Sequence, residues 1–556
     1  MTLTIFLISY FVIILSVVGY GLFFQNVFGK SLNLEFEYSF LGGLFFLVSL
    51  SYATHFFVSH NYFHNLIIFI TGLIFFSIFS LKKKEIFKRY SKIVFLIFGI
   101  LFIAFLTAKT HDDFPYYHFP YTYYLTQEKL IIGTGNLNHG FRTPSSIFYL
   151  NSLFYLPFIK YFFFQIGAIL IFGASNLILI FKLKNDFKNK TYDFVFFLTI
   201  LSFLFINTFF YRIAEHGTDR SAQILIFILF IEILSLLRNS IFLEKFLSKI
   251  FIILGFIISL KAFYVLYLLV LFPIFFYIKK RNFKKLITIL LKNFYFYIFL
   301  LVGIFLISVN IFNSGCVLYP VSFSCFPNLE WSLFQEAKLM NNWYELWSKG
   351  GASPNFRVED PENYIKGFNW FNNWIDIYFF NKISDFLAGI FFMLIIFLIT
   401  FYSKTKKKIK NYNFFWIYFI LIILFFEWFF NHPSLRYGGY SLIALIIFIP
   451  FSLIVSRFSL NKYFKKKVIF LILLSIIIFT GRNVNRVHNE INIYDYDLMS
   501  NPIYILEESH FRINFFMDEL KEKYDNCDNV NKSNCNTYNG ISIGTIKNYY
   551  YLTKNK

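Results

Sequence analysis

The chain has little charge, few acidic residues and little cysteine. Only 15% of its 556 residues are charged, and 31 of these are acidic against 52 basic. A soluble protein of this length carries more charge and fewer long apolar runs, so the composition excludes an ordinary soluble domain. The four cysteines form two nearby pairs, Cys316/Cys325 and Cys527/Cys535, and neither pair has the CxxC spacing of a zinc site.

Most of the chain consists of apolar residues. The chain is 57% hydrophobic and 24% aromatic, with a mean hydropathy of +0.58. Its apolar runs are long enough for membrane helices, whereas a transmembrane barrel would show short alternating segments. We expect an all-α polytopic membrane protein of roughly 13–14 transmembrane helices. The predicted spans are 3–27, 38–58, 64–81, 91–108, 160–182, 192–210, 221–237, 250–260, 262–278, 288–312, 386–403, 412–430, 436–456 and 467–480.

The basic residues predict the orientation. The formal net charge is +21, but the lysines lie in short loops, so the positive-inside rule and contact with lipid phosphates account for them, and no nucleic-acid partner is expected. The loops predicted to be cytoplasmic are 81–92, 181–190, 277–285, 404–410 and 461–467. The intervening connections, both chain ends and both cysteine pairs are then external, where disulfides persist.

Titratable residues gather in the external connections. The stretch KTHDDFPYYHFP (109–120) places Asp112, Asp113 and His118 beside a span. Two adjacent carboxylates repel each other, which suits a general base or a cation site. Solvated loop acids are the structural alternative.

Further charged residues occur at the same predicted side of the membrane. YRIAEHGTDR (211–220) adds acids and arginines, HPSLRYGGY adds an arginine at a span end, and IISLKAFYVLYL holds a lone lysine. Converging acids and arginines could hold a divalent cation or a phosphate-bearing substrate. The residues concerned are Arg212, Glu215, His216, Asp219, Arg220, Lys261 and Arg436.

Four stretches, in this order along the chain, resemble the GT-C-type membrane glycosyltransferases. DFPYYHFP (113–120) is similar to the first external loop of that family, and residues 128–157 to its continuation. ISLKAFYVLYLLVLFPIFFYIKK resembles the lysine-containing hairpin of the family, and LRYGGYSLIALIIFIP its late span. The resemblance covers about residues 91–456. The chain departs from the family pattern in having His-Asp-Asp where many members have Asp-Glu, and it lacks the Trp-Trp-Asp motif of oligosaccharyltransferases.

The resemblance implies a sugar transferase that uses a polyprenyl-phosphate donor. Asp113 would be the general base, supported by Asp112 or His118. Lys261 and Arg436 would bind the donor phosphate. Other substrate-binding residues expected at the site are Tyr117, Arg212, Glu215, His216, Asp219 and Tyr437. If a divalent cation, Mg²⁺ or Mn²⁺, takes part, its expected ligands are Asp113, Glu215 and Asp219.

The expected division of the chain follows the same resemblance. Residues 1–90 would be additional N-terminal spans, 91–312 the catalytic membrane core, 313–385 a large external loop, 386–480 the C-terminal spans and 481–556 an external tail. The expected location is the inner membrane of a bacterium with the active site facing outside. The partners would be the bilayer, the lipid-linked donor and a glycan, lipid or protein acceptor. A polysaccharide polymerase or ligase, or a non-catalytic transporter of lipid-linked sugars, remains an alternative.

Overall fold

The structure of the protein is a computed structural model. It describes residues 1–27, 34–82, 84–106, 113–214, 217–238, 243–279, 283–353, 356–407, 414–502, 521–522 and 540–554. The structural findings refer to these residues.

The described chain is folded mainly into α-helices. The first ten are α1 Leu3–Val27, α2 Phe36–His55, α3 Tyr62–Lys82, α4 Lys84–Phe105, α5 Phe119–Gln127, α6 Ser146–Ser152, α7 Ile166–Asn189, α8 Phe194–Phe209, α9 Gly217–Arg238 and α10 Leu243–Leu260. The others are α11 Leu271–Lys279, α12 Phe283–Lys292, α13 Phe294–Ser314, α14 Phe334–Lys349, α15 Pro361–Ile365, α16 Phe371–Trp374, α17 Ser384–Phe401, α18 Phe415–Asn431, α19 Gly439–Ser456 and α20 Phe464–Tyr494.

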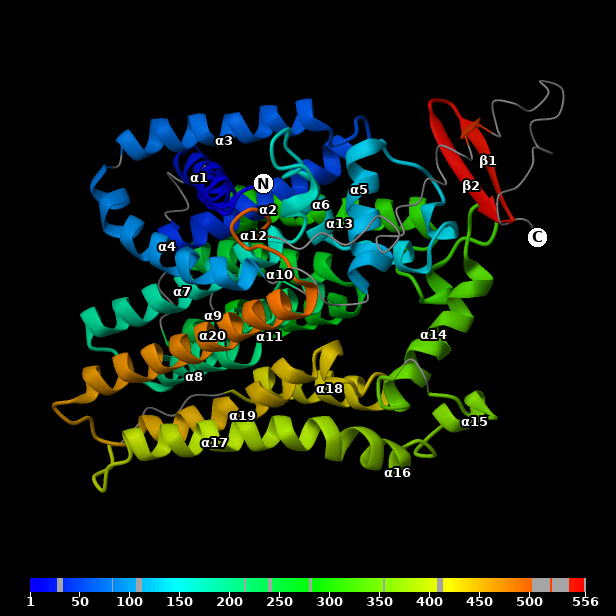
Figure 1. Ribbon diagram of the computed structural model, residues 1–556. Helices are drawn as coiled ribbons and strands as arrows, with labels where there is room; N and C mark the ends of the chain where they lie inside the picture. The colour runs from blue at the N-terminus through cyan, green and yellow to red at the C-terminus, as the bar shows by residue number, and fades with distance from the viewer. Residues whose placement is uncertain are drawn as a thin grey trace.

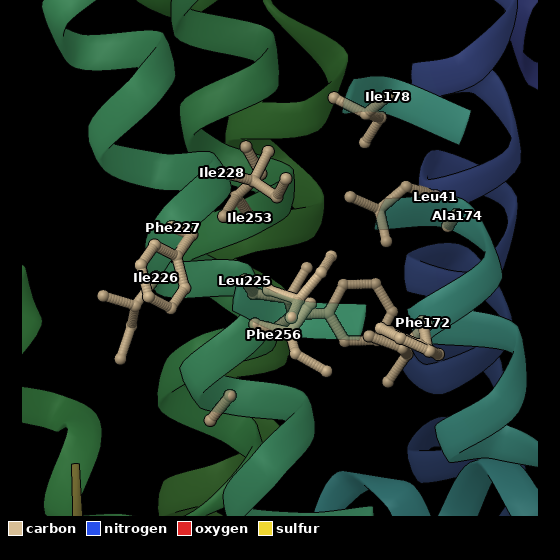
Figure 2. Packing of buried hydrophobic residues seen from close by; sticks show 14 of the residues in the cluster. Leu41, Phe172, Ala174, Ile178, Leu225, Ile226, Phe227, Ile228, Ile253 and Phe256 are labelled. Atoms are coloured by element: carbon tan, nitrogen blue, oxygen red, sulfur yellow. The ribbon is translucent and has the colours of Figure 1, made fainter. Parts of the chain in front are cut away.

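The long helices pack side by side into a bundle (Figure 1). Helices in its centre are buried on every face. In α9 nearly every side chain from Ala222 to Leu234 is buried, as expected for a helix surrounded by other helices. Figure 2 shows its Leu225 beside Phe256 of α10, on the side of α9 that faces Phe172 of α7. Helix α3, by contrast, leaves large apolar side chains such as Ile67 and Ile74 exposed. An apolar outer face of this kind suits contact with lipid.

The protein is an α-helical polytopic membrane protein. Among the described residues, eight helical segments are long and apolar enough to cross a membrane, and four shorter apolar helices accompany them. Each of the fourteen predicted spans coincides with a helical segment, although several boundaries differ. The span predicted at 250–260 is the second part of α10. The prediction began too late because the first turns of α10 carry Glu244, Lys245 and Lys249, which interrupt the apolar run.

The connections separate into two ends of the bundle, as the predicted topology requires. The end of α3, the start of α4 and the links between α7 and α8 and between α19 and α20 lie at one end, on the left in Figure 1. We call this the basic-loop end. There the two basic loops near residues 405 and 458 pair through their backbones, with Lys407 N–H donating to the Arg457 carbonyl at 2.7 Å. Glu232, buried near this end, accepts a hydrogen bond from Lys182 at 2.8 Å and pairs with Lys249 at 3.4 Å.

Helices α5 and α14 and a C-terminal β-hairpin lie at the opposite end, on the right in Figure 1. We call this the site end. Strands β1 Ile541–Ile546 and β2 Tyr549–Lys554 are antiparallel, and Ile132 exchanges backbone hydrogen bonds with β2 at 2.8 and 2.9 Å. The predicted C-terminal tail therefore includes strands docked on the first long connection, which its mixed composition did not reveal. The predicted Cys316–Cys325 disulfide is confirmed, whereas Cys527 and Cys535 lie outside the described residues.

Candidate functional site

Four charged side chains from four separate segments of the chain meet at the site end. Arg436 Nη2 lies 2.5 Å from Asp113 Oδ2, and its Nε lies 2.9 Å from Asp219 Oδ2. The other oxygen of Asp219, Oδ1, lies 2.6 Å from Lys261 Nζ. The formal charges of these four groups cancel, and we call them the ion cluster. The structure thus brings together Asp113, Asp219, Lys261 and Arg436, while their catalytic and binding roles stay predictions.

Asp219 is the buried centre of the ion cluster. It lies in the first turn of α9, before the apolar part that starts at Ser221, and it is 2% exposed. Burial raises the pKa of this carboxyl, but the positive charges of Lys261 and Arg436 outweigh burial and hold the pKa below its usual value. Asp219 therefore stays ionised and keeps both cations in place.

Lys261 lies at a break between two helical segments. Helix α10 ends at Leu260, Lys261 is extended (φ −160°, ψ 140°), and a 3₁₀ helix begins at Ala262. The break places the lysine at the helix end instead of inside an apolar span, where a charge costs several kcal/mol. Its ammonium group lies 4.8 Å from the centre of the Tyr437 ring, a cation–π contact.

Arg436 is held by a tightly anchored turn. It belongs to a one-turn 3₁₀ helix, Leu435–Tyr437, followed by Gly438 with φ +106°, a value that glycine adopts without strain. The Gln223 amide of α9 donates to the Arg436 carbonyl at 3.0 Å and accepts from Ser441 N–H at 3.2 Å. Gln223 thereby fixes the backbone on both sides of Gly438.

Aromatic side chains from α16, from the π-helical segment that follows it and from α18 hold the same turn. Tyr378 hydroxyl accepts from Leu435 N–H at 2.9 Å. The indole of Trp374 donates to the Pro433 carbonyl at 3.0 Å, and that of Trp428 to the Ser434 carbonyl at 2.8 Å. These contacts fix the backbone from which the Arg436 side chain reaches Asp113 and Asp219.

Tyr117 and Tyr437 border the ion cluster. Tyr117 packs so closely on Gly140 that a Cβ there would lie 2.2 Å from its ring, so Gly140 permits the first connection to fold back. The Trp347 ring from α14 contacts Tyr437, with centroids 5.5 Å apart. On the same helix, Tyr344 hydroxyl lies 3.3 Å from His139 Nε2. Helix α14, part of the segment predicted as a large external loop, therefore covers one side of the site.

Three further candidates from the sequence, His118, Arg212 and Arg220, lie in the described part of the chain. The His118 ring packs against Phe148, with centroids 5.1 Å apart, in the π-helical turn Phe114–His118 that follows Asp113. Arg212 accepts a hydrogen bond at its carbonyl from Arg220 at 3.0 Å. Asp112, Glu215 and His216 lie outside the described residues.

The ion cluster as described does not form a cation site. Both oxygens of Asp219 are engaged by cationic side chains, so a divalent cation would compete with Lys261 and Arg436. Among the described residues, no three His, Cys, Asp or Glu side chains are grouped as metal ligands, and Glu215 lies outside them. A metal requirement stays a prediction, and no chemical step is assigned to one.

Sequence reasoning missed the residues that position the site. Gln223, a single amide inside the apolar run of α9, carried a signal, because a buried amide needs hydrogen-bond partners. Trp374, Tyr378 and Trp428 carried none, since aromatic residues occur throughout this chain.

Comparison with known proteins gives a family and no function. No curated protein and no solved structure matches the chain. One family model matches residues 1–443, a stretch that contains all four residues of the ion cluster and ends before α20. The chain therefore belongs to the family described as Domain of unknown function (DUF8201).

Proposed function

We propose that the protein is a GT-C-type membrane glycosyltransferase that moves a sugar from a polyprenyl-phosphate donor to an acceptor hydroxyl at the site end, on the outer face of the membrane. The acceptor is a glycan, a lipid or a protein. The location proposed for the enzyme is the inner membrane of a bacterium.

One observation carries this proposal: residues chosen for a catalytic base and for phosphate binding meet in a single ion cluster. Asp113 and Arg436 are 323 positions apart in the chain, yet their side chains are in contact. A carboxylate beside an arginine and a lysine is the combination that a phosphate leaving group and a hydroxyl nucleophile require.

Arg436 is suited to bind the donor phosphate. Its Nε and Nη2 donate to the two aspartates, so Nη1 remains for a phosphate oxygen, and 27% of the side chain is exposed. Lys261, also partly exposed, supplies a second positive charge. Charge-assisted hydrogen bonds of this type stabilise the negative charge that develops on the phosphate as it leaves.

Asp113 is the proposed general base. It takes the proton of the acceptor hydroxyl as the acceptor oxygen bonds to the anomeric carbon of the sugar. The bond from that carbon to the phosphate oxygen breaks, and its electron pair leaves on the polyprenyl phosphate. The products are the glycosylated acceptor and free polyprenyl phosphate, with the proton on Asp113.

The test is the Asp113→Asn variant, assayed in proteoliposomes with a panel of radiolabelled polyprenyl-phosphate hexoses and pentoses. Asparagine keeps the shape of the side chain and removes the base, so transfer should fall about 10²–10⁴-fold. The matched control is Asp376→Asn, which changes an exposed aspartate of the π-helical segment Ile375–Ile383 and should leave the rate as in the wild type.

Transfer at the wild-type rate by Asp113→Asn would refute the assignment of the base. A wild-type protein that carries lipid-linked sugars across the vesicle membrane without releasing polyprenyl phosphate would instead support the transporter alternative.

A further inference from the structure

Two tryptophans of α14 connect the ion cluster with the surface of the site end. The Trp347 ring packs against Tyr437, with centroids 5.5 Å apart, and the Tyr437 ring in turn lies 4.8 Å from the ammonium group of Lys261. Trp343, one helical turn earlier, is 43% exposed. Because residues four apart lie on one face of a helix, the two indoles form a line from the ion cluster toward solvent. We call Trp343 and Trp347 the tryptophan pair.

Polar groups lie beside the exposed indole of Trp343. Its ring centre is 5.9 Å from that of His139 and 5.4 Å from that of Tyr344, and His139 Nε2 lies 3.3 Å from the Tyr344 hydroxyl. Burial, and then the charge of Arg142, lower the pKa of His139, so its ring is neutral at neutral pH and has one donor and one acceptor nitrogen. Asp113 opposes this shift, so the proposed base lies within electrostatic reach of this group.

The tryptophan pair differs from the tryptophans that hold the fold together. In the latter the indole N–H donates to a backbone carbonyl at 2.8–3.0 Å, as in Trp331, Trp370, Trp374 and Trp428. In the described part of the chain, the indoles of Trp343 and Trp347 donate to no residue. Helix α14 is also not among the segments apolar enough to cross a membrane, so contact with lipid tails does not account for the pair. Each indole keeps its N–H donor for a ligand.

Helix α14 is anchored at both ends, so the tryptophan pair is held in place before a ligand binds. Near its start, Ala337 packs with Cys316 of the disulfide-bonded loop. At its end, Lys349 Nζ donates to the Ile365 carbonyl at 2.7 Å and lies 5.1 Å from the centre of the Trp370 ring. A surface that is already ordered loses little conformational entropy on binding.

We propose that the tryptophan pair binds sugar rings of the acceptor, so that the acceptor of the transfer reaction is a glycan, either free or attached to a lipid. This inference rests on the proposed function. A sugar ring has a C–H face that stacks on an indole, and its hydroxyl groups pair with polar side chains such as His139 and Tyr344. A glycan that lies along the pair ends beside Tyr437 and the ion cluster, where Asp113 takes the proton of its terminal hydroxyl.

The test measures binding of the purified full chain, in a neutral detergent, to an array of immobilised hexose, pentose and heptose oligosaccharides from bacterial surface polysaccharides. No donor is added, so binding is measured without transfer. Trp343→Ala should bind the recognised glycans at least tenfold more weakly than the wild type, and Trp343→Phe, which keeps an aromatic ring, should lose less. The matched control is Trp416→Ala, which removes an indole of α18 that is 54% exposed and should bind as the wild type does. Thermal unfolding shows whether each variant is folded.

Wild-type affinity for the glycans in the folded Trp343→Ala variant would overturn the proposal and leave contact with the membrane surface as the role of the indole. Binding of no oligosaccharide on the array by the wild-type protein would overturn it as well. Failure of the proposed function gives a different result, because glycan binding would still depend on Trp343 while lipid-linked sugars released no polyprenyl phosphate.

Discussion

Arg436 joins the two aspartates of the ion cluster, and the backbone of its turn is fixed by Gln223 and three aromatic residues. Lys261 and Arg436 together compensate the buried charge of Asp219. The removal of one member of such a group leaves an unpaired charge and costs more than the removal of a pair.

This dependence predicts a measurable coupling between Asp219 and Lys261. Asp219→Asn should destabilise the protein because two cations lose their partner, and Lys261→Gln should destabilise it less because Arg436 still pairs with Asp219. The double variant should be more stable than the sum of the two effects implies, with a coupling of about 0.5–3 kcal/mol. Thermal unfolding of all four proteins in detergent measures it. Strictly additive effects would show that the pair contributes nothing.

The lowered pKa of His432 predicts that the protein loses stability on mild acidification. Burial first, and then the charges of Lys349 and Lys261, lower the pKa of His432 to about 4. The unfolded chain takes up a proton at this position below about pH 6.5 while the folded protein does not. The free energy of unfolding therefore decreases by about 1–3 kcal/mol as the pH falls from about 6.5 to about 4.

His432→Gln removes this contribution, so its stability should fall less than that of the wild type between pH 7 and pH 5, as measured by unfolding at both pH values. His488→Gln, an exposed histidine of α20, should leave the wild-type difference unchanged. An equal fall in all three proteins would argue against the role of His432.

At the scale of single residues, the sequence indicates the charged residues of the ion cluster but not the residues that hold them in position. Asp113, Asp219, Lys261 and Arg436 are conspicuous because charges are rare in this chain. The partners of Arg436 are common residue types whose roles depend on helix packing, and packing is not visible in a single sequence.

At the scale of elements, the C-terminal hairpin is tied to the first long connection. Gly133 has φ +79°, and a Cβ there would lie 2.2 Å from the Leu552 carbonyl oxygen of β2. Asn136 also donates to that oxygen, at 3.1 Å. The connection that carries Asp113 is therefore covered by strands more than 400 positions away.

Gly133→Ala should release the hairpin, because the added methyl group and β2 cannot occupy the same space. Amide exchange in residues 541–554 should become faster than in the wild type. Gly540→Ala is the matched control, since Gly540 has φ +76° with open space around it, so that it shares the backbone strain without the clash. Equal protection of the hairpin in both variants would refute the contact.

The elements themselves follow from apolar runs where those runs are uninterrupted. Helices α1, α3 and α8 begin and end within a few residues of the prediction. Helix α20 continues to Tyr494, well beyond the predicted end at 480, because its polar residues, Arg482 and Asn483 among them, remain helical. The hairpin in the tail has no apolar run of that length to mark it.

At the scale of the whole molecule, the two ends of the bundle differ in content. The links between α7 and α8 and between α19 and α20 lie at one end, and α14 and the hairpin lie at the other. The ion cluster lies beside α14, whose Trp347 contacts Tyr437. The positive-inside rule predicts that the basic-loop end is cytoplasmic.

Single cysteines introduced at exposed positions test this orientation. Glu362→Cys lies in α15 at the site end, and Lys462→Cys lies between α19 and α20 at the basic-loop end. A membrane-impermeant maleimide should label Glu362→Cys in intact cells and Lys462→Cys only after permeabilisation, with the parent protein as the background. The reverse pattern would place the ion cluster in the cytoplasm and exclude an outward-facing active site.

The central claim is that the ion cluster transfers a sugar from a polyprenyl phosphate. The most direct measurement is the amount of polyprenyl phosphate released per sugar transferred by the wild-type protein in proteoliposomes supplied with lipid-linked sugars and acceptors. We predict one molecule released for each sugar transferred, with both products lost together in Asp113→Asn. Absence of polyprenyl phosphate release from every donor of the panel, by a folded protein, would contradict the account.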